Sequence, residues 1–259
     1  MVESGGVYYR TEVQKIPFLA RLCPSLYFYF KLILIVLRSS SMARKGMYDG
    51  ERWMMSSLEV VKSLETVGVM LDIRGLDNLK KTEGPVVIIG NHMSMMETVV
   101  LPWIVRPFRK VTYVIKESLL TYPVFHHIMK SRNPIAVTRT NPRQDLKTVM
   151  SEGVERIKND ISVIVFPQTT RAYRFDPEQM SSIGVKLAKK ADVPIIPLAL
   201  KTDCWQNGRK LKDFGRIIPG RTAYFSFGKP IKISGKGDVE QQLVNDFIAE
   251  ELNKWTNDE

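Results

Sequence analysis

From Val67 onward, short apolar segments of strand length alternate with segments of helix length, and this alternation constrains the fold more than any other feature of the chain. The strand candidates are Val69–Ile73, Pro85–Ile89, Val111–Ile115, Pro134–Val137, Ser162–Phe166, Val193–Leu200 and Ala223–Phe227. The helix candidates are Glu97–Val105, Arg143–Lys158, Pro177–Lys190 and Val239–Trp255. Apolar strands separated by helices are typical of a sheet buried on both faces. The pattern therefore predicts an α/β fold with a mixed, largely parallel sheet covered by helices on both faces.

Two further helices precede this region, and they predict an N-terminal hairpin. Residues 26–37 (LYFYFKLILIVL) are apolar at every position except Lys31, and Asp49–Thr66 carries an apolar stripe at helical spacing. The apolar run is shorter than the about 20 residues that span a bilayer. Its aromatic residues and flanking bases favour a helix that lies in or dips into a membrane interface. A buried core helix is the alternative.

The chain is long enough for one large domain with a full core, since 44% of its 259 residues are hydrophobic and no flexible linker divides it. We expect residues 1–66 to form a membrane-associating helical hairpin and residues 67–259 to form the α/β domain. The first residues include Glu3 and no apolar run follows directly, so no signal peptide is predicted. Cys23 and Cys204 lack metal-ligand spacing, which fits a reducing cytosolic environment without a zinc site or disulfide framework.

Basic residues outnumber acidic ones by 38 to 27, giving a net charge of +11. The excess is concentrated in residues 106–158 and 201–236, where bases are interleaved with apolar segments. Such a charge distribution attracts polyanions: nucleic acid, an anionic bilayer or phosphorylated small molecules. The chain lacks a helix-turn-helix, zinc-finger or RNP-type motif, so nucleic-acid binding is an alternative that rests on charge alone.

Residues 85–97 (PVVIIGNHMSMME) run from a buried strand through a polar turn into a helix. Open α/β sheets place their chemistry at such strand ends. His92 and Glu97 are five residues apart, so their side chains meet only if His92 lies in the turn and Glu97 in the first helical turn. Ser94 and Glu97 also match a capping box, in which Glu97 bonds back to the amide of the cap. The residues alone leave both interpretations open: a catalytic pair, or a helix cap beside a partly buried histidine.

Three more strand ends carry informative residues: 133–139 (NPIAVTR), 161–171 (ISVIVFPQTTR) and 193–200 (VPIIPLAL). Arg139 and Arg171 each follow a strand. A single arginine is more often a solvated surface residue than a ligand. Two arginines at strand ends of a basic chain indicate a shared phosphate pocket.

In their order along the chain, these segments resemble the motif set of the glycerophospholipid acyltransferases, and in particular of the 1-acylglycerol-3-phosphate acyltransferases. The motifs are Asn-His-x4-acid, a strand ending in Arg, Phe-Pro-x-x-Thr-Arg and Val-Pro-x-x-Pro, and the resemblance covers residues 70–230. The hairpin resembles the membrane-docking element of bacterial members. The resemblance implies acyl transfer from acyl-CoA or acyl-carrier protein to the hydroxyl of a lysophospholipid, forming phosphatidic acid from 1-acylglycerol-3-phosphate. It also implies a protein associated with the cytoplasmic side of a membrane.

The resemblance assigns roles to individual positions. His92 would be the general base, because imidazole has a pKa near neutrality, and Glu97 would orient the ring and stabilise the imidazolium. No metal or cofactor is required. The remaining positions would bind substrate: Arg139 and Arg171 the phosphate of the acceptor, with Lys116 as a weaker candidate, and Gln168 and Thr170 beside them.

The chain departs from the family pattern at three positions. Glu97 stands where the family usually has Asp, and Gln168 and Thr169 replace a Glu and a Gly. Gln168 keeps size and hydrogen bonding but removes a negative charge. Acyltransferases that modify lipid A resemble this chain in accepting Glu at the acid position. A lipid-binding relative with altered or lost activity is the alternative that these changes leave open.

Overall fold

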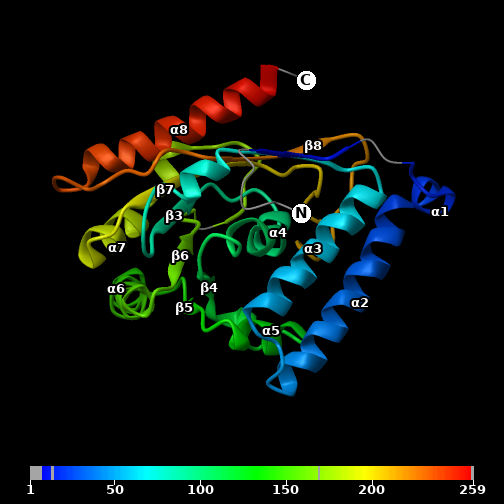
Figure 1. Cartoon of the computed structure of the whole chain (residues 1–259), viewed down its shortest axis with the longest axis horizontal. Helices are drawn as coiled ribbons and strands as arrows, with labels where there is room; N and C mark the ends of the chain where they lie inside the picture. The colour runs from blue at the N-terminus through cyan, green and yellow to red at the C-terminus, as the bar shows by residue number, and fades with distance from the viewer. Residues whose placement is uncertain (1–7, 13–14, 169, 258–259) are drawn as a thin grey trace.

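The computed structural model describes residues 8–12, 15–168 and 170–257, whose strands form one eight-stranded sheet (Figure 1). In space the strands are ordered β1-β2-β8-β7-β3-β6-β4-β5. Their bounds are β1 Tyr8–Arg10, β2 Met70–Arg74, β3 Val87–Gly90, β4 Val111–Lys116, β5 Ile135–Val137, β6 Ser162–Val165, β7 Ile195–Lys201 and β8 Thr222–Phe227. All neighbours pair in parallel except β1 with β2 and β7 with β8. The predicted mixed, largely parallel sheet is confirmed.

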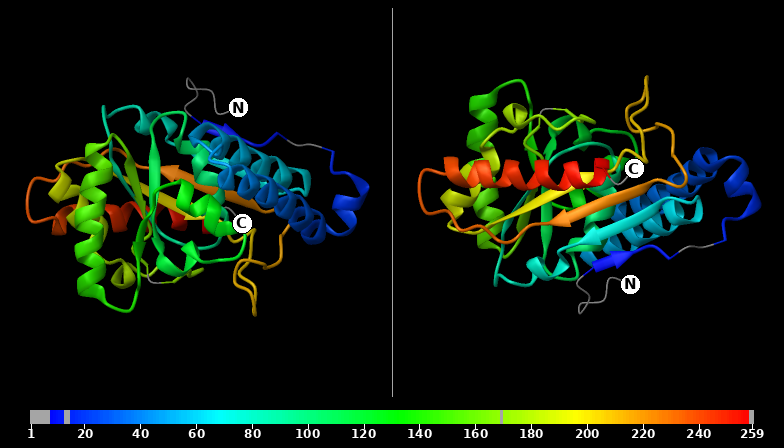
Figure 2. Two further views of the ribbon diagram at one scale, coloured as in Figure 1. Left: turned by 90° about the horizontal axis from the view of Figure 1, so that it is seen from below. Right: turned by 90° about the horizontal axis from the view of Figure 1, so that it is seen from above.

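Helices cover both faces of this sheet (Figures 1 and 2). Their bounds are α1 Phe18–Leu22, α2 Pro24–Arg44, α3 Gly50–Thr66, α4 Met96–Val105, α5 Phe125–Ser131, α6 Pro142–Lys158, α7 Ile183–Ala191 and α8 Asp238–Asn257. Short 3₁₀ turns lie at Leu76–Leu79, Glu117–Leu120 and Pro177–Gln179. Successive residues of β3 point to opposite faces, as a strand requires. Ile88 packs into the cluster under α2 to α5, whereas Val87 and Ile89 pack into the cluster under α6 to α8.

The structure differs from the sequence expectations in several elements. The helix predicted for Pro177–Lys190 is divided, because Met180 takes an extended conformation and is buried between the 3₁₀ turn and α7. The apolar run at 26–37 forms part of the longer helix α2, which continues through the serines at 39–41; one of them, Ser40, donates a 2.7 Å hydrogen bond to the carbonyl of Val124. The short elements β1, α1 and α5 have no counterpart in the expected pattern.

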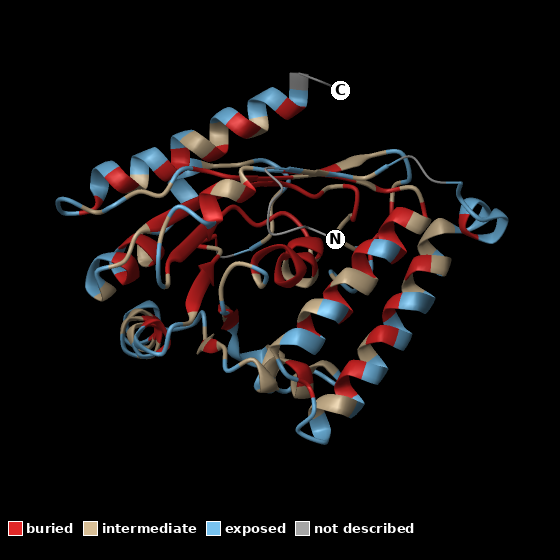
Figure 3. Cartoon of the chain, viewed as in Figure 1, coloured by how far each residue is buried: buried red, intermediate tan, exposed pale blue. Residues whose placement is uncertain are grey.

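Helices α2 and α3 form the predicted hairpin, and α2 has two unlike faces (Figure 3). Phe28, Leu32 and Ile35 are buried against the body of the protein. The opposite face exposes large apolar side chains: Leu26, Phe30, Ile33, Leu34 and Leu37. The alternative of a buried core helix thus describes one face of α2, and contact of the other face with a membrane stays a prediction. Within the described residues, α2 is also the helix whose length and composition would suffice to cross a membrane.

Two side chains from other elements complete the hydrogen bonding of α4. Pro102 lies inside this helix and cannot donate to the carbonyl of Thr98, which instead accepts from the Tyr113 hydroxyl at 3.2 Å. Ser57 of α3 fills the next position: its hydroxyl accepts from the amide of Trp103 at 3.0 Å and donates to the carbonyl of Val99 at 2.6 Å. The hairpin is therefore bonded directly into the helix that carries Glu97.

The division of the chain at residue 66 stays a prediction. Strand β1 lies in the first segment but pairs with β2 in the second, with Tyr9 opposite Ile73. Phe28 of α2 packs edge-to-face on Trp205 with the ring centres 4.8 Å apart. The two segments therefore share a sheet and a core.

Candidate functional site

The candidate site lies at one edge of the sheet, where five adjacent parallel strands end. In spatial order these strands are β7, β3, β6, β4 and β5, and each is followed or closed by a polar residue. These residues are Thr202 after β7, His92 after β3, Gln168 after β6, Lys116 at the end of β4 and Arg139 after β5. The carboxyl ends of parallel strands meet at one edge, which brings together residues far apart in the sequence.

His92 and Glu97 are in contact in the way that their spacing allows. His92 lies in the turn after β3, and Glu97 lies in the first turn of α4. The ring nitrogen Nδ1 of His92 is 2.9 Å from Oε1 of Glu97. Among the described residues none hydrogen-bonds the other ring nitrogen, Nε2, and His92 lines a cavity. A carboxylate bound at Nδ1 fixes the ring orientation and favours the tautomer in which Nε2 can accept a proton.

Glu97 also closes the turn, so the capping interpretation holds beside the pairing. Its Oε1 accepts from the amides of Met93 and Ser94 at 2.7 and 2.8 Å. Its Oε2 accepts from the hydroxyls of Ser94 and Thr202 at 3.0 and 2.8 Å. The Ser94 hydroxyl caps α4 by accepting from the amide of Met96 at 3.0 Å. Both carboxylate oxygens of Glu97 are therefore fully used by donors.

The surroundings keep Glu97 ionised although its side chain is completely buried. Burial by itself would raise its pKa, but the hydrogen bond and charge of His92, followed by the bonds from Ser94 and Thr202, outweigh it. The pKa of Glu97 lies below its usual range as a result. A charged acid at neutral pH is what stabilising an imidazolium requires.

The loop after β6 holds His92 from the other side. The Gln168 side-chain oxygen accepts from the His92 amide at 2.5 Å, and the Ala172 amide donates to the His92 carbonyl at 3.0 Å. The Phe166 ring stacks on the imidazole with its centre 4.7 Å away and the planes 9° apart. The backbone and ring of His92 are thus both fixed.

A cavity of about 780 Å³ extends from His92 between the sheet edge and the hairpin. Apolar side chains of α2, α3 and α5 form one part of its wall, including Leu32, Trp53 and Ile128. Five of the predicted site residues line the cavity: His92, Lys116, Arg139, Thr170 and Arg171. The wall of the cavity therefore has an apolar part and a basic part, here called its apolar and basic compartments, and His92 belongs to the same wall.

Arg139 and Arg171 lie close enough to repel each other. Burial, and then the charge of Arg171, lower the pKa of Arg139. Arg171 forms a 2.7 Å ion pair with Asp213, which also lines the cavity. Two neighbouring guanidinium groups, one exposed on Arg139 and one partly buried on Arg171, match the geometry and charge of a phosphate.

The remaining predicted positions differ in placement. Lys116 and Thr170 are exposed at the cavity rim, and Thr170 accepts from the Lys212 ammonium at 3.3 Å. Gln168 is buried behind His92, where its oxygen is bound to the backbone. Thr169 lies outside the described residues. The substrate-binding roles of all these positions stay predictions.

Three residues of the site were missed from the sequence. Thr202 had a detectable signal, because it is the first hydroxyl after an apolar strand that neighbours β3. Phe166 sits at the start of the Phe-Pro motif, but its stacking on His92 needs the fold to be seen. Asp213 lies in a long loop between β7 and β8, and no pattern connects it with Arg171.

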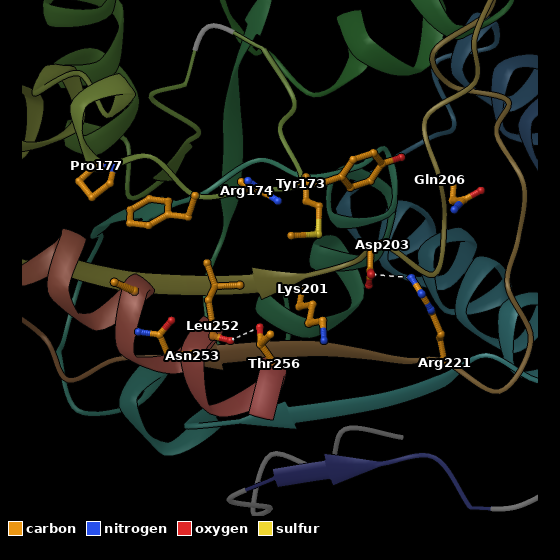
Figure 4. Close-up of a pocket in the computed structure, with 13 residues that line it drawn as sticks. Tyr173, Arg174, Pro177, Lys201, Asp203, Gln206, Arg221, Leu252, Asn253 and Thr256 are labelled. Carbon is orange, nitrogen blue, oxygen red and sulfur yellow. Dashed lines mark hydrogen bonds and ion pairs between the residues drawn. The ribbon is translucent and has the colours of Figure 1, made fainter. Parts of the chain in front are cut away.

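A second cavity, of about 590 Å³, has Met93 in its wall, and Figure 4 shows the side chains that line it. Lys201, Arg221 and Asp203 line it together with residues of α8. The three charged residues just named have partners: Arg221 pairs with Asp203 at 2.6 Å (Figure 4), and Lys201 donates to the Trp255 carbonyl at 3.0 Å. It contains none of the predicted site residues. Over the described residues, no cluster of three or more His, Cys, Asp or Glu side chains could hold a metal ion.

With this site and fold, the chain belongs to the acyltransferase family, whose sequence model matches residues 70–201. It is 33% identical over 132 residues to the 1-acyl-sn-glycerol-3-phosphate acyltransferase of Pseudomonas aeruginosa, covering 51% of this chain and 49% of that protein. It is 27% identical over 164 residues to the enzyme of the same name from Cocos nucifera, covering 62% and 50%. The chain thus spans about half the length of these relatives.

A solved structure has the same fold over almost the whole chain. The crystal structure of the 1-acyl-sn-glycerophosphate acyltransferase PlsC from Thermotoga maritima matches with a TM-score of 0.65, covering 92% of this chain and 97% of that one. The identity is 18%, so this likeness concerns the fold. Family and fold both agree with the resemblance drawn from the motifs.

Proposed function

We propose that this chain transfers a fatty acyl group from acyl-CoA or acyl-carrier protein to the hydroxyl of a lysophospholipid, 1-acylglycerol-3-phosphate giving phosphatidic acid. The observation that carries the proposal is the buried His92–Glu97 hydrogen bond, at 2.9 Å, on the wall of a cavity with an apolar and a basic compartment. The names of the relatives support the choice of acceptor.

In this mechanism His92 Nε2 removes the proton from the acceptor hydroxyl as its oxygen attacks the carbonyl carbon of the thioester. Glu97 keeps the proton on Nδ1 and stabilises the imidazolium that forms. The tetrahedral intermediate then expels the thiolate, which takes the proton from Nε2. The new oxygen ester and the free thiol are the products. The acceptor supplies the nucleophile, so no covalent enzyme intermediate is needed.

The two compartments of the cavity divide the substrates between them. Arg139 and Arg171 would bind the phosphate of the acceptor through charge-assisted hydrogen bonds. The apolar wall from α2, α3 and α5 would hold an acyl chain out of water. A phosphorylated head with an apolar tail is the substrate that such a pair of compartments fits.

The exposed apolar face of α2 supports association with a membrane, where lysophospholipids reside. Leu26 is 72% exposed and Phe30 is 60% exposed, a pattern that a bilayer interface would cover. We assign the cytoplasmic side, because thioester donors and a reducing environment are found there. Residues 1–66 would be the docking hairpin of this assembly.

A lipid-binding protein without activity is the competing proposal, since Gln168 replaces the usual acid of its motif. In this structure Gln168 performs a task open to either side chain, accepting a bond from the His92 amide. The His92–Glu97 pair therefore does not depend on an acid at 168, which favours the enzyme. Nucleic-acid binding rests only on the net charge.

The test is acyl transfer by the purified chain, with labelled long-chain acyl-CoA or acyl-carrier protein and a panel of lysolipids. We expect His92→Ala to lower turnover by about 10²–10⁴-fold, the range for loss of a general base. His127→Ala is the matched control, because His127 lies on α5 and is not among the described residues that line the cavity. Unimpaired turnover in a folded His92→Ala protein would reject the mechanism. Absence of transfer in the wild-type chain with every acceptor would favour the lipid-binding alternative.

A further inference from the structure

The loop that joins β7 to β8 contains much of the basic segment 201–236. Its segment 206–216 projects from the body of the protein (Figure 2, where it lies at the bottom of the left view and the top of the right view). Four exposed bases lie in it: Arg209, Lys210, Lys212 and Arg216. The proposed chemistry uses none of the exposed bases at its tip, Arg209 and Lys210.

Large apolar side chains are exposed among these bases. Leu211 is 61% exposed and Phe214 is 44% exposed. Exposed leucine and phenylalanine between cations are the composition of segments that enter the interface of an anionic bilayer. A surface evolved only for a soluble polyanion has no need of exposed apolar groups.

The segment has a defined shape. Its ends are joined by backbone hydrogen bonds from Gln206 to Arg216 at 2.9 Å and from Gly208 to Lys212 at 3.1 Å. A Cβ on Gly215 would lie 1.8 Å from the carbonyl oxygen of Gln206, so only glycine permits this closure. Because the loop already has a fixed shape, little conformational entropy is lost when its tip binds a partner.

The loop rests on the helix that exposes the other apolar surface. The Tyr29 hydroxyl of α2 donates to the Gly215 carbonyl at 2.6 Å, and the Tyr29 and Phe214 rings are 5.3 Å apart. Lys212, Asp213 and Phe214 also line the cavity that reaches His92. The loop tip, α2 and the cavity are therefore neighbours.

We propose that segment 206–216 is a second contact with an anionic bilayer, beside α2, which sets the mouth of the cavity against the lipid surface. The proposal rests on the proposed function in taking the acceptor from a membrane. An acidic carrier protein is the other partner that four bases could attract. The exposed Leu211 at the tip favours the bilayer, because moving its apolar surface from water into the bilayer lowers the free energy.

The experiment measures vesicle co-sedimentation of the full chain, using phosphatidylcholine vesicles with and without phosphatidylglycerol. Arg209→Gln combined with Lys210→Gln should weaken binding to the anionic vesicles on the order of tenfold and flatten its salt dependence. Leu211→Ser should weaken binding to both vesicle types by about tenfold. None of these three residues lines the cavity, and all three are exposed, so the melting temperature should not change.

Lys229→Gln combined with Lys232→Gln is the matched control. These exposed lysines belong to the same basic block but lie in the connection from β8 to α8, at the end of the molecule opposite α1 (Figure 1). Removing the same charge there should leave vesicle binding nearly unchanged. An equal loss in the control would make the attraction a property of net charge and would overturn the proposal.

A further arm separates the two partners. Acyl transfer from acyl-carrier protein to a monomeric short-chain acceptor is measured without vesicles. If the Arg209/Lys210 variant loses this activity and keeps its vesicle binding, the loop docks the carrier protein and the bilayer proposal is wrong. If the variants lose vesicle binding while wild type transfers no acyl group at all, the proposed function fails and this inference stands.

Discussion

The two sides of His92 are built in opposite ways. Behind the ring, Glu97, Ser94 and Thr202 are completely buried and bonded to one another at 2.8 to 3.0 Å. In front of it, the cavity is wide and its charged groups lie at the ends of long side chains such as Arg171 and Lys116. The side chains behind the ring are held in one conformation, whereas the long side chains in front of it can adopt several.

Under the proposed function, the closed side of His92 would fix the chemistry and the open side would select the substrate. A short, closed hydrogen-bond set holds one geometry, as the orientation of a general base requires. Long cations around a cavity can adjust to a head group and release it. Changes behind His92 should therefore lower kcat, and changes in front of it should act on KM.

The largest effect should come from Glu97→Gln. The amide can keep the turn, with its oxygen facing the amides of Met93 and Ser94 and its nitrogen facing the hydroxyls of Ser94 and Thr202. It cannot supply the negative charge. We expect kcat to fall by roughly 10⁴-fold, as it does for the analogous acid-to-amide change in a serine-protease triad, while stability changes by about 1 kcal/mol or less.

Glu65→Gln is the control for neutralising a buried glutamate. Glu65 accepts hydrogen bonds from Tyr9 and Thr11 and is not among the described residues that line the cavity. Its replacement should leave kcat unchanged. Near-normal kcat in Glu97→Gln would assign Glu97 to the turn alone, and the two sides of His92 would no longer differ in function.

An intermediate effect is expected from Arg139→Gln and Arg171→Gln, measured separately. Each removes charge-assisted hydrogen bonds to a phosphate, and KM for the acceptor should rise about tenfold or more while kcat changes little. Arg143→Gln, an exposed position on α6, is the control. A fall in kcat with unchanged KM would mean that these arginines act in the chemical step, and the two sides of His92 would then not differ in function.

The smallest effect is expected from Asp213→Asn. The carboxylate of Asp213 holds Arg171 at 2.7 Å and competes with the phosphate of the acceptor. Because the pair is partly exposed, its removal should lower KM for the acceptor by only about two- to fivefold. Steady-state kinetics over a range of acceptor concentrations would decide. A raised KM would mean that Asp213 orients the arginine and does not compete for it.

The sequence was a good guide wherever local pattern and burial agree. Every predicted strand exists, because apolar runs such as Ser162–Val165 are buried on both faces and have no other stable place. β1 was missed because its three residues, Tyr8–Arg10, alternate exposure at the sheet edge and carry no apolar run. The length of α2 was underestimated, because the hydrogen bond of Ser40 to the carbonyl of Val124, just before α5, cannot be read from the local pattern.

In the candidate site, the residues that follow strands could be predicted and those that come from the long loop could not. His92 and Arg139 follow β3 and β5, and their presence on the wall of one cavity follows from a parallel sheet whose strands end at the same edge. The choice between a cap and a partner of His92 for Glu97 could not be made from the sequence, because one carboxylate oxygen bonds both the His92 ring and the Ser94 amide. Asp213 needed the folded loop, since its approach to Arg171 depends on the tertiary path of 206–216.

The buried hydroxyl of Ser57 connects the hairpin to the folding of α4. It bridges the carbonyl of Val99 and the amide of Trp103, of which the bond to Trp103 is buried and the bond to Val99 is partly buried. Without α3 both groups would lose this partner, and the buried amide of Trp103 would be left at a cost comparable to a lost buried hydrogen bond. The hairpin and the helix that bears Glu97 are consequently one cooperative unit, and a chain shortened at residue 66 would lose structural support for α4.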